Sequence, residues 1–183
     1  SFAEYERHVA VLVRSGVLED STKIWWDVRP SARYPTLEAR VMDVCTRLED
    51  SITLAAMVQC LMRALYRLRV RNQRWRSFSN MLIQENRWRA MRYGCDGGLI
   101  DFGISQVVPY QALLDELMEI MAEDAEHLGC AAEVRRAAEI VNRGNSATRQ
   151  VATYESAIAE GATRQDALKR VVDMLIEETA MDL

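Results

Sequence analysis

The sequence predicts a mostly helical α+β chain. Long segments with apolar residues three or four apart, closed by glycines, predict helices through most of the 183 residues. Two short runs near the start, at about 23–29 and 36–44, alternate in polarity and predict a β-hairpin. An isolated two-stranded hairpin is barely stable in water. We therefore expect this hairpin to belong to a larger antiparallel sheet.

The N-terminal part is expected to hold one helix and the hairpin. Ser1 and Glu4 have the spacing of a capping box and open a helix over about 2–14. Pro30 and Pro35 are expected to bracket the hairpin loop, because proline cannot donate a hydrogen bond to a β-ladder. The sequence thus predicts that the helix precedes the hairpin and that the strands end at the two prolines.

Residues 48–183 are expected to form the helical part of the same domain, with 1–47 as the helix and hairpin part. A second capping box, from Thr46 to Glu49, predicts a long helix. Leu99–Ile104 is expected as a short strand or an extended cover segment. Helices are expected over about 46–69, 80–93, 109–128, 130–143, 145–160 and 163–179.

Composition excludes several classes of protein. No apolar run approaches the roughly 20 residues of a membrane span, and no signal peptide is visible, so we expect a cytoplasmic protein without a membrane partner. The two histidines argue against a histidine-based metal site or a Ser-His-Asp triad. Four widely spaced cysteines form no CxxC pair, and we expect buried free thiols. They are Cys45, Cys60, Cys95 and Cys130.

Charge is strongly segregated along the chain, although the net charge is only −4. Residues 63–92 contain nine arginines and one acid, whereas residues 111–139 contain eight acids and two arginines. Such polarity can mark an anion site, a nucleic-acid surface or two helices that pair. The negative net charge and the two lysines argue against nucleic acid. Glycine-rich phosphate loops are absent from the sequence.

Four charged residues are predicted to share one side of the hairpin. Residues two apart in a strand point to the same face. Asp27 therefore shares a face with Arg29, and Glu38 shares a face with Arg40. Two interpretations stay open from spacing alone. The charges can form a cross-strand salt ladder on a solvated face, or the carboxylates can hold magnesium while the arginines hold phosphate or carboxylate oxygens.

A second charged cluster lies on the helix predicted over 80–93. Glu85, Arg89 and Arg92 fall on one face of that helix. These arginines can pair with the acidic helix over 111–126, or they can clamp a triphosphate or a substrate carboxylate. Spacing does not separate the two interpretations.

Several stretches resemble the carboxylate–amine ligase family, also called the type 2 glutamate–cysteine ligase family, of the glutamine synthetase-like superfamily. The two hairpin stretches and the arginine-rich helix are the most specific, and the resemblance spans essentially the whole chain in order. The stretches are Ser1–Tyr5, Trp25–Ser31, Thr36–Asp43, Glu85–Gly94 and Gly144–Gln150.

The resemblance implies a fold, a reaction and roles for particular residues. The fold is a curved antiparallel sheet with the active site on its concave face and helices behind it. The reaction is an ATP- and Mg²⁺-dependent phosphorylation of a carboxylate, classically glutamate, followed by attack of an amine, classically cysteine. Glu38 would bind magnesium, while Arg40 and Arg29 would contact phosphate or substrate as catalytic residues. Weaker candidates for nucleotide binding are Arg87, Arg89 and Arg92.

Members of this family are about twice as long as this chain, so the resemblance identifies it with their C-terminal half. We expect it to need an N-terminal half, or a second chain, to act on amino-acid substrates. Arginine and magnesium can stabilise the charge of an acyl-phosphate route without a nucleophilic side chain. The alternative is a catalytically inactive helical module for docking or oligomerisation. The amine substrate, self-association and the role of Asp27 are left open.

Overall fold

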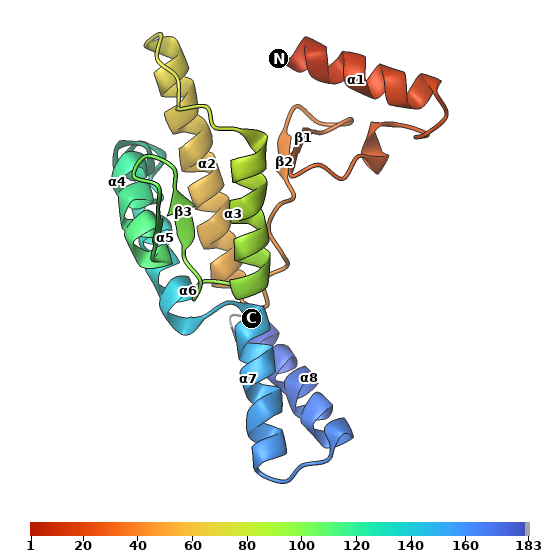
Figure 1. Cartoon of the computed structure of the whole chain (residues 1–183), viewed down its shortest axis with the longest axis vertical. Helices are drawn as coiled ribbons and strands as arrows, with labels where there is room; N and C mark the ends of the chain where they lie inside the picture. The colour runs from red at the N-terminus through yellow and green to blue at the C-terminus, as the bar shows by residue number, and fades with distance from the viewer. Residues whose placement is uncertain (182–183) are drawn as a thin grey trace. The chain divides into compact units, whose positions relative to one another are not determined.

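The structure is a computed structural model in which residues 1–181 are described. The chain forms two compact units, Ser1–Val44 and the part from Cys45 on. Helices predominate, and the described residues contain two small antiparallel sheets of two strands each, which confirms the predicted mostly helical α+β class (Figure 1). Whether the two units belong to one catalytic domain stays a prediction.

The first unit begins with helix α1 (Phe2–Arg14), whose predicted capping box is present: the Ser1 side chain accepts from the Glu4 backbone, and Glu4 accepts from the first backbone nitrogen. A short 3-10 turn, η1 (Ser21–Lys23), follows. Its start is capped by Asp20, whose carboxylate accepts from the Thr22 backbone at 2.7 Å. This turn occupies the place where the sequence predicted the start of the first strand.

The predicted hairpin is present but short. Strands β1 (Val28–Pro30) and β2 (Leu37–Ala39) pair antiparallel, with Arg29 opposite Glu38. Strand β1 ends at Pro30, the residue that the sequence predicted as the boundary between the first strand and the loop. The cross-strand hydrogen bonds are made by the residues on either side of Pro30. For example, the Ser31 backbone nitrogen donates to the Thr36 carbonyl at 2.9 Å. Pro30 therefore occupies a position that needs no N–H in the ladder.

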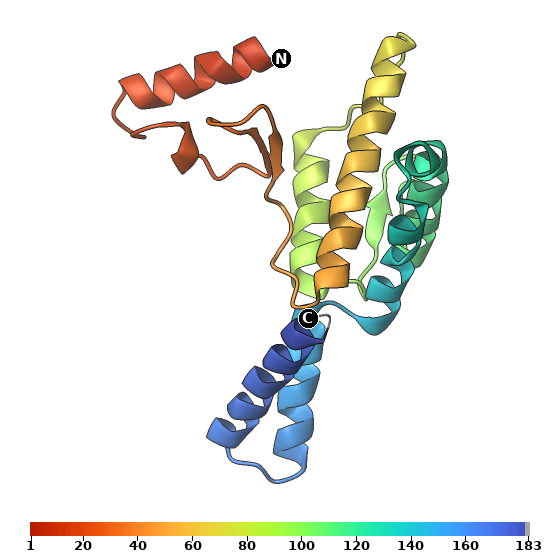
Figure 2. The ribbon, with the colours of Figure 1, turned by 180° about the vertical axis from the view of Figure 1, so that it is seen from behind.

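The second unit is built on helix α2 (Leu48–Val70), which packs against helix α4 (Tyr110–Leu128) (Figure 2). Ala56, Cys60 and Ala64 recur every four residues on α2 and are buried. Their small side chains allow a close approach of the neighbouring helix. The largest fully buried side chain in the described core is Met121 of α4. A helix–helix contact of this kind forms the core of the unit.

Helix α3 (Asn80–Tyr93) is joined to a second hairpin, made by β3 (Leu99–Asp101) and β4 (Gln106–Val108). The Asn86 side chain donates to the Ile100 carbonyl at 2.9 Å and accepts from the Ile100 backbone nitrogen at 2.8 Å. One amide thus fixes the hairpin to α3. The sequence predicted either a short strand or an extended cover segment over Leu99–Ile104, and it did not predict β4.

The remaining helices follow the predicted order. The segment predicted as one helix over 130–143 is two helices, α5 (Ala131–Arg135) and α6 (Ala137–Arg143). At the junction, Arg136 donates to Glu133 and accepts from Glu139, and both bonds span three residues instead of four. This tighter turn separates the two helices.

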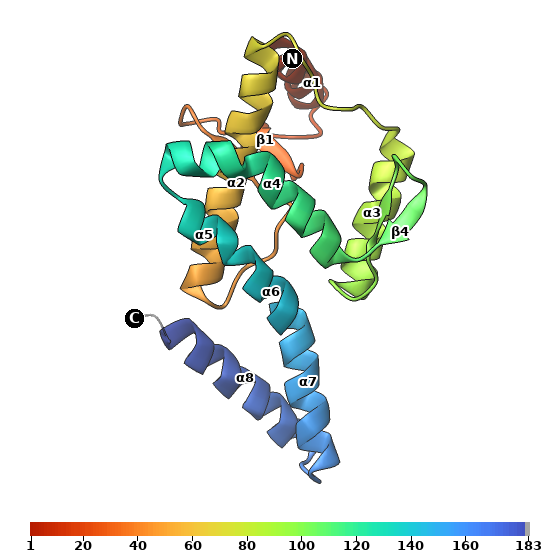
Figure 3. The same ribbon diagram turned by 90° about the vertical axis from the view of Figure 1, so that its left-hand side faces the viewer.

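Helices α7 (Ser146–Ala159) and α8 (Arg164–Ala180) form an antiparallel pair (Figure 3). Asn145 caps α7 by accepting from the Thr148 backbone nitrogen, and Thr163 caps α8 by accepting from the Asp166 backbone nitrogen. None of the helices described over 1–181 combines the length and apolar character needed to cross a membrane.

The predicted capping box at Thr46 is wrong. Helix α2 begins at Leu48 with Arg47 at its N-cap, and no side chain bonds to the start of the helix. The Thr46 hydroxyl donates instead to the carboxylate of Glu178 at 2.6 Å. A tertiary hydrogen bond has therefore replaced the local one that the spacing favours.

Candidate functional site

The charged face of the hairpin is organised around Glu38. The backbone register places Arg29 directly opposite it, and Arg40 lies two residues further along the same strand face. Glu38 Oε2 accepts from Arg29 Nε at 2.8 Å and from Arg40 Nη1 at 3.1 Å. The bond from Arg29, with help from Arg40 and Ser31, holds the pKa of Glu38 below its ordinary value. Glu38 is therefore an ionised carboxylate at neutral pH.

Arg29 is tied to the backbone of its own unit. It is only 8% exposed, and its Nη1 donates to the carbonyls of Ser21, Thr22 and Ile24 at 3.2, 2.7 and 2.8 Å. These bonds fix the 3-10 turn against the hairpin and fix the guanidinium beside Glu38. The geometry gives Arg29 a positioning role, and its predicted contact with phosphate or substrate stays a prediction.

Arg40 is the more accessible of the two arginines that bind Glu38. Its side chain is 39% exposed, and its guanidinium lies 5.7 Å from the ring centroid of Trp25, which is itself exposed. The Arg40 backbone nitrogen donates to the Asp27 carbonyl at 2.7 Å, so the main chain fixes this position. The ion pairs match the salt ladder that the sequence left open. The ladder leaves Arg40 reachable for an anion.

The arginines of α3 differ in their surroundings. Arg89 donates to the carbonyls of Gly97 and Gly98 at 2.6 and 3.3 Å, and so clamps the turn that follows the helix. Both Arg89 and Arg92 lie over the ring of Tyr93, at 5.6 and 5.8 Å. Arg92 and Arg87 are exposed. The predicted roles of these three arginines in nucleotide binding stay predictions.

The acidic helix α4 pairs with α2. Asp124 is fully buried and accepts hydrogen bonds from Arg63 and Arg67, and Arg67 also contacts Glu123 at 3.0 Å. Burial alone would raise the pKa of Asp124, but the bonds from Arg67 and Arg63 outweigh it and lower the pKa. Part of the charge segregation in the sequence is therefore a helix–helix contact.

A second buried charge network was missed by sequence reasoning. Arg149 donates to both carboxylate oxygens of Glu178, at 2.7 and 2.8 Å, to Thr46 at 3.2 Å and to the Gly144 carbonyl at 2.6 Å. The stretch 144–150 was noticed only for its family resemblance, and nothing in the sequence singled out Glu178. The network joins the segment before α2 to the α7–α8 pair.

A hollow of about 510 Å³ lies in the second unit. Its lining combines two arginines and two acids with aromatic walls, which suits a small ligand that carries both charges. None of the predicted site residues lines it. The residues that give it this character are Arg74, Trp75, Arg76, Phe78, Asp101, Phe102 and Glu116.

The described residues offer limited material for a metal site. Over 1–181, no group of three or more His, Cys, Asp or Glu side chains is placed to hold a metal ion. Magnesium commonly uses only one or two protein carboxylates, and takes its other ligands from phosphates and water. Glu38 fits such a shared site, because both arginine bonds are made to Oε2 and Oε1 accepts none from an arginine.

Comparison with known proteins identifies the family. Residues 1–173 match the family described as "Glutamate-cysteine ligase family 2 (GCS2)". The chain is 57% identical over 183 residues to a protein of Rhodospirillum rubrum and 54% identical to one of Ruegeria pomeroyi. A protein of Sorangium cellulosum is 43% identical over the same length. Each is named "Putative glutamate--cysteine ligase 2".

These matches define the class of protein to which the chain belongs. It belongs to glutamate–cysteine ligase family 2, as the resemblance predicted. All 183 residues are covered in the three comparisons, but they correspond to 47% of each relative. The chain thus spans about half the length of the curated relatives that it matches.

Proposed function

We propose that the chain is part of an ATP-dependent carboxylate–amine ligase that resembles glutamate–cysteine ligase. The reaction would join a carboxylate to an amine through an acyl-phosphate. Family membership supports the ligase class. The observation that carries the site is the ionised carboxylate of Glu38, held on a strand by two arginines with its pKa lowered.

Each hairpin residue has a defined part in this proposal. Glu38 would bind Mg²⁺ through the oxygen that the arginines leave free, and the ion would neutralise charge on the transferring phosphoryl group. Arg40, which is partly exposed, would contact phosphate or substrate. Arg29 would keep Glu38 in place. Arg87 and Arg92 are exposed and would contact the nucleotide, whereas Arg89 would act through the turn that it clamps.

The proposal requires residues beyond this chain. Glu38 would supply one ligand of the magnesium ion, and phosphoryl transfer needs several further groups placed around the ion and the nucleotide. The chain corresponds to 47% of its relatives. We therefore propose that an N-terminal half, on the same or a second chain, supplies the remaining ligands and that the substrates are amino acids. The cytoplasm is the proposed location.

A titration tests this proposal. ATP with Mg²⁺ is titrated calorimetrically into the chain alone, into an N-terminal half taken from the family, and into the two together. Phosphate release with glutamate and cysteine is followed in parallel. We expect binding and phosphate release only with the two together. A soluble pair that binds no ATP would overturn the ligase proposal.

The second candidate is a docking or oligomerisation module, and the α7–α8 pair favours it. Leu168, Val172 and Ile176 lie on one face of α8, at spacings of four residues, and are 51%, 53% and 61% exposed. Val151 and Ile158 are exposed apolar residues of α7. If the chain were only such a module, self-association would occur in sedimentation experiments, and ATP would not bind the reconstituted pair.

A further inference from the structure

Two cysteines that lie far apart in the sequence meet in the core of the second unit. Cys60 lies in the middle of α2, and Cys130 lies between the end of α4 and the start of α5. Their Sγ atoms are 3.5 Å apart, and both cysteines are free. A separation of 3.5 Å is a non-bonded contact, since a disulfide has an S–S distance of about 2.05 Å.

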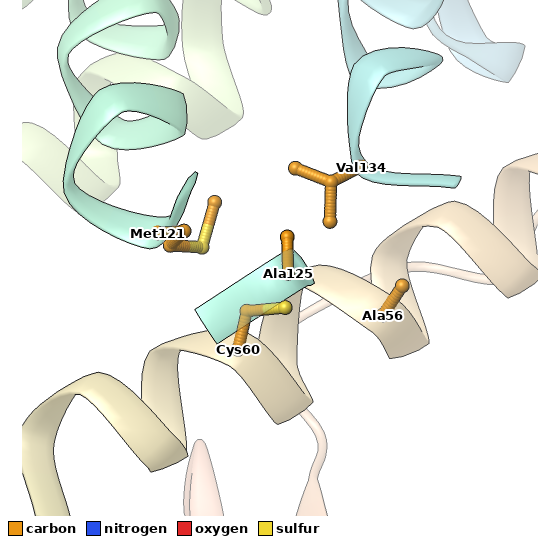
Figure 4. Close-up of a cluster of buried hydrophobic side chains, with 5 residues drawn as sticks. All are labelled: Ala56, Cys60, Met121, Ala125 and Val134. Atoms are coloured by element: carbon orange, nitrogen blue, oxygen red, sulfur yellow. The ribbon is translucent and has the colours of Figure 1, made fainter. Parts of the chain in front are cut away.

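The two thiols differ in access. Cys60 is fully buried among Ala56, Met121, Ala125 and Val134 (Figure 4). Burial, together with the contact to Cys130, raises the pKa of the Cys60 thiol to about 12. Cys130 is only partly buried. A small oxidant therefore reaches Cys130 first, and Cys60 stays protected behind it.

We propose that Cys60 and Cys130 form a modification site at which peroxide-type oxidants produce an intramolecular disulfide. Hydrogen peroxide first transfers an oxygen atom to the Cys130 sulfur, which gives a sulfenic acid and one water. The Cys60 sulfur then attacks the Cys130 sulfur, the S–O bond breaks, and the Cys60 proton leaves with the hydroxyl group as a second water. Overall, two thiols are oxidised and one peroxide is reduced.

The position of Cys130 permits the small movement that this step needs. The sulfurs must approach by roughly 1.5 Å, the difference between their contact and a bond of about 2.05 Å. Cys130 follows Gly129, which has a left-handed backbone with φ +69°, and precedes the five-residue helix α5. Because it lies in a connection, Cys130 can shift more readily than Cys60 within α2. The raised pKa of Cys60 slows the second step, and contact between the two sulfurs favours it.

The disulfide would link α2 to the junction of α4 and α5. It would close a loop of about 70 residues, and a cross-link over such a loop restricts the unfolded chain and favours the folded state. Oxidation is therefore expected to raise the melting temperature of the chain by several degrees. This inference does not depend on the proposed ligase activity.

The test is oxidation of the whole chain with one equivalent of hydrogen peroxide, followed by alkylation under denaturing conditions. We expect an intact mass lower by about 2 Da before alkylation, a cross-linked peptide pair that contains Cys60 and Cys130, and a higher melting temperature. Dithiothreitol should reverse all three changes.

Four variants make the outcome specific. Cys130→Ser should abolish the disulfide and leave Cys60 reduced, whereas Cys60→Ala should leave a sulfenic acid on Cys130 that dimedone traps. Cys45→Ser and Cys95→Ser should oxidise as the parent does. The proposal is wrong if both thiols are alkylated after oxidation, or if the disulfide found joins Cys45 or Cys95 instead.

Discussion

Glu38 combines two properties at the scale of a single residue. Its two arginine partners keep it ionised, and both bind the same oxygen. A carboxylate arranged in this way is fixed in position, and its Oε1 accepts no bond from either arginine. The same contacts contribute to the folding of the hairpin. A substitution that removes the charge but keeps the shape of the side chain separates the proposed metal-binding role from the structural role.

Glu38→Gln is predicted to remove metal-dependent turnover of the reconstituted protein while the fold is retained. The amide can still accept from Arg29, but it is a poor ligand for Mg²⁺. Loss of an outer-shell partner lowers metal affinity or activity about 10–100-fold, so the loss of a ligand should be at least this large. Turnover against Mg²⁺ concentration and circular dichroism are the measurements.

Glu19→Gln is the control for this variant. Glu19 belongs to the same unit, and its side chain is 84% exposed with a weak contact to Lys23 at 3.9 Å. The Glu19→Gln variant should leave turnover and fold unchanged. If Glu38→Gln unfolds the first unit instead, Glu38 serves the salt ladder alone.

Glu178 is predicted to make stability depend on acid pH. Arg149, followed by Thr46, holds the pKa of Glu178 below its ordinary value of 4.5. The stabilisation is therefore complete above about pH 4.5 and is lost as the pH falls through the lower pKa of the folded state. Glu178→Gln should lower the stability at pH 7 by about 1.5–3 kcal/mol, the range for a hydrogen bond to a charged group.

The difference between the parent and Glu178→Gln should then shrink as the pH falls toward 3. Urea unfolding at a series of pH values measures this. The exposed neighbour Glu177 supplies the control, Glu177→Gln, which should follow the parent at every pH. If the plots of stability against pH for the parent and Glu178→Gln run parallel, the carboxylate of Glu178 does not cause the pH dependence of stability.

Strand alternation predicted that Glu38 and Arg40 share a face, because that relation depends only on spacing along one strand. It could not predict that Arg29 is buried under three carbonyls. Those acceptors lie in, or directly after, a 3-10 turn that Asp20 caps. Glu178 was missed for a similar reason, since its partner Arg149 lies on a different helix.

At the scale of elements, the contact of α2 with α4 combines a row of small residues with a buried ion pair. Ala56, Cys60 and Ala64 bring the helices together. Asp124 then lies fully buried against Arg63 and Arg67, which are 27% and 21% exposed. The arginines can reach water, but the carboxylate cannot. The pair is therefore sensitive to loss of the acid.

Asp124→Ala is predicted to destabilise the chain by about 3 kcal/mol, because removing one partner of a buried ion pair leaves charges uncompensated. Glu123→Ala is the matched control: Glu123 contacts the same Arg67, but it is 57% exposed, and exposed pairs contribute about 0–1 kcal/mol. Urea unfolding measures both variants. Equal effects would mean that burial of Asp124 does not matter.

The helices were largely predictable because caps, stop glycines and apolar spacing are local signals. The capping box at Ser1 is present as predicted, and helices α7 and α8 begin near the expected positions, with Asn145 and Thr163 as their caps. The signal failed at Thr46, whose hydroxyl bonds to Glu178 across the unit. Strand β4 was missed because three residues carry too little periodicity to separate a strand from a loop.

At the scale of the whole molecule, the first unit exposes apolar side chains on one face of its hairpin. Val28 and Leu37 lie on the hairpin face opposite Arg29 and Glu38, and they are 49% and 54% exposed. Among the described residues, β1 and β2 pair only with each other. The expectation that this hairpin belongs to a larger sheet stays a prediction, and the exposed face supports it.

The division at Val44 predicts where a protease will cut the chain. Residues 40–44 are all exposed, and Val44 is 82% exposed. Exposed connections between compact units are preferred sites of cleavage. Elastase should therefore cut after Val44 first. The product that starts at Cys45 should keep its helical circular dichroism, because the helix–helix core at Met121 lies wholly within it.

Val151 is an internal control for this cleavage, since it is 55% exposed but lies within α7. A helix must open locally before a protease can bind its backbone, so cleavage there should be much slower. Val44→Glu should slow the first cut without a change in the helical signal. Early cleavage inside α2 or α7, or loss of helicity on cutting at Val44, would mean that the second unit does not hold together without residues 1–44.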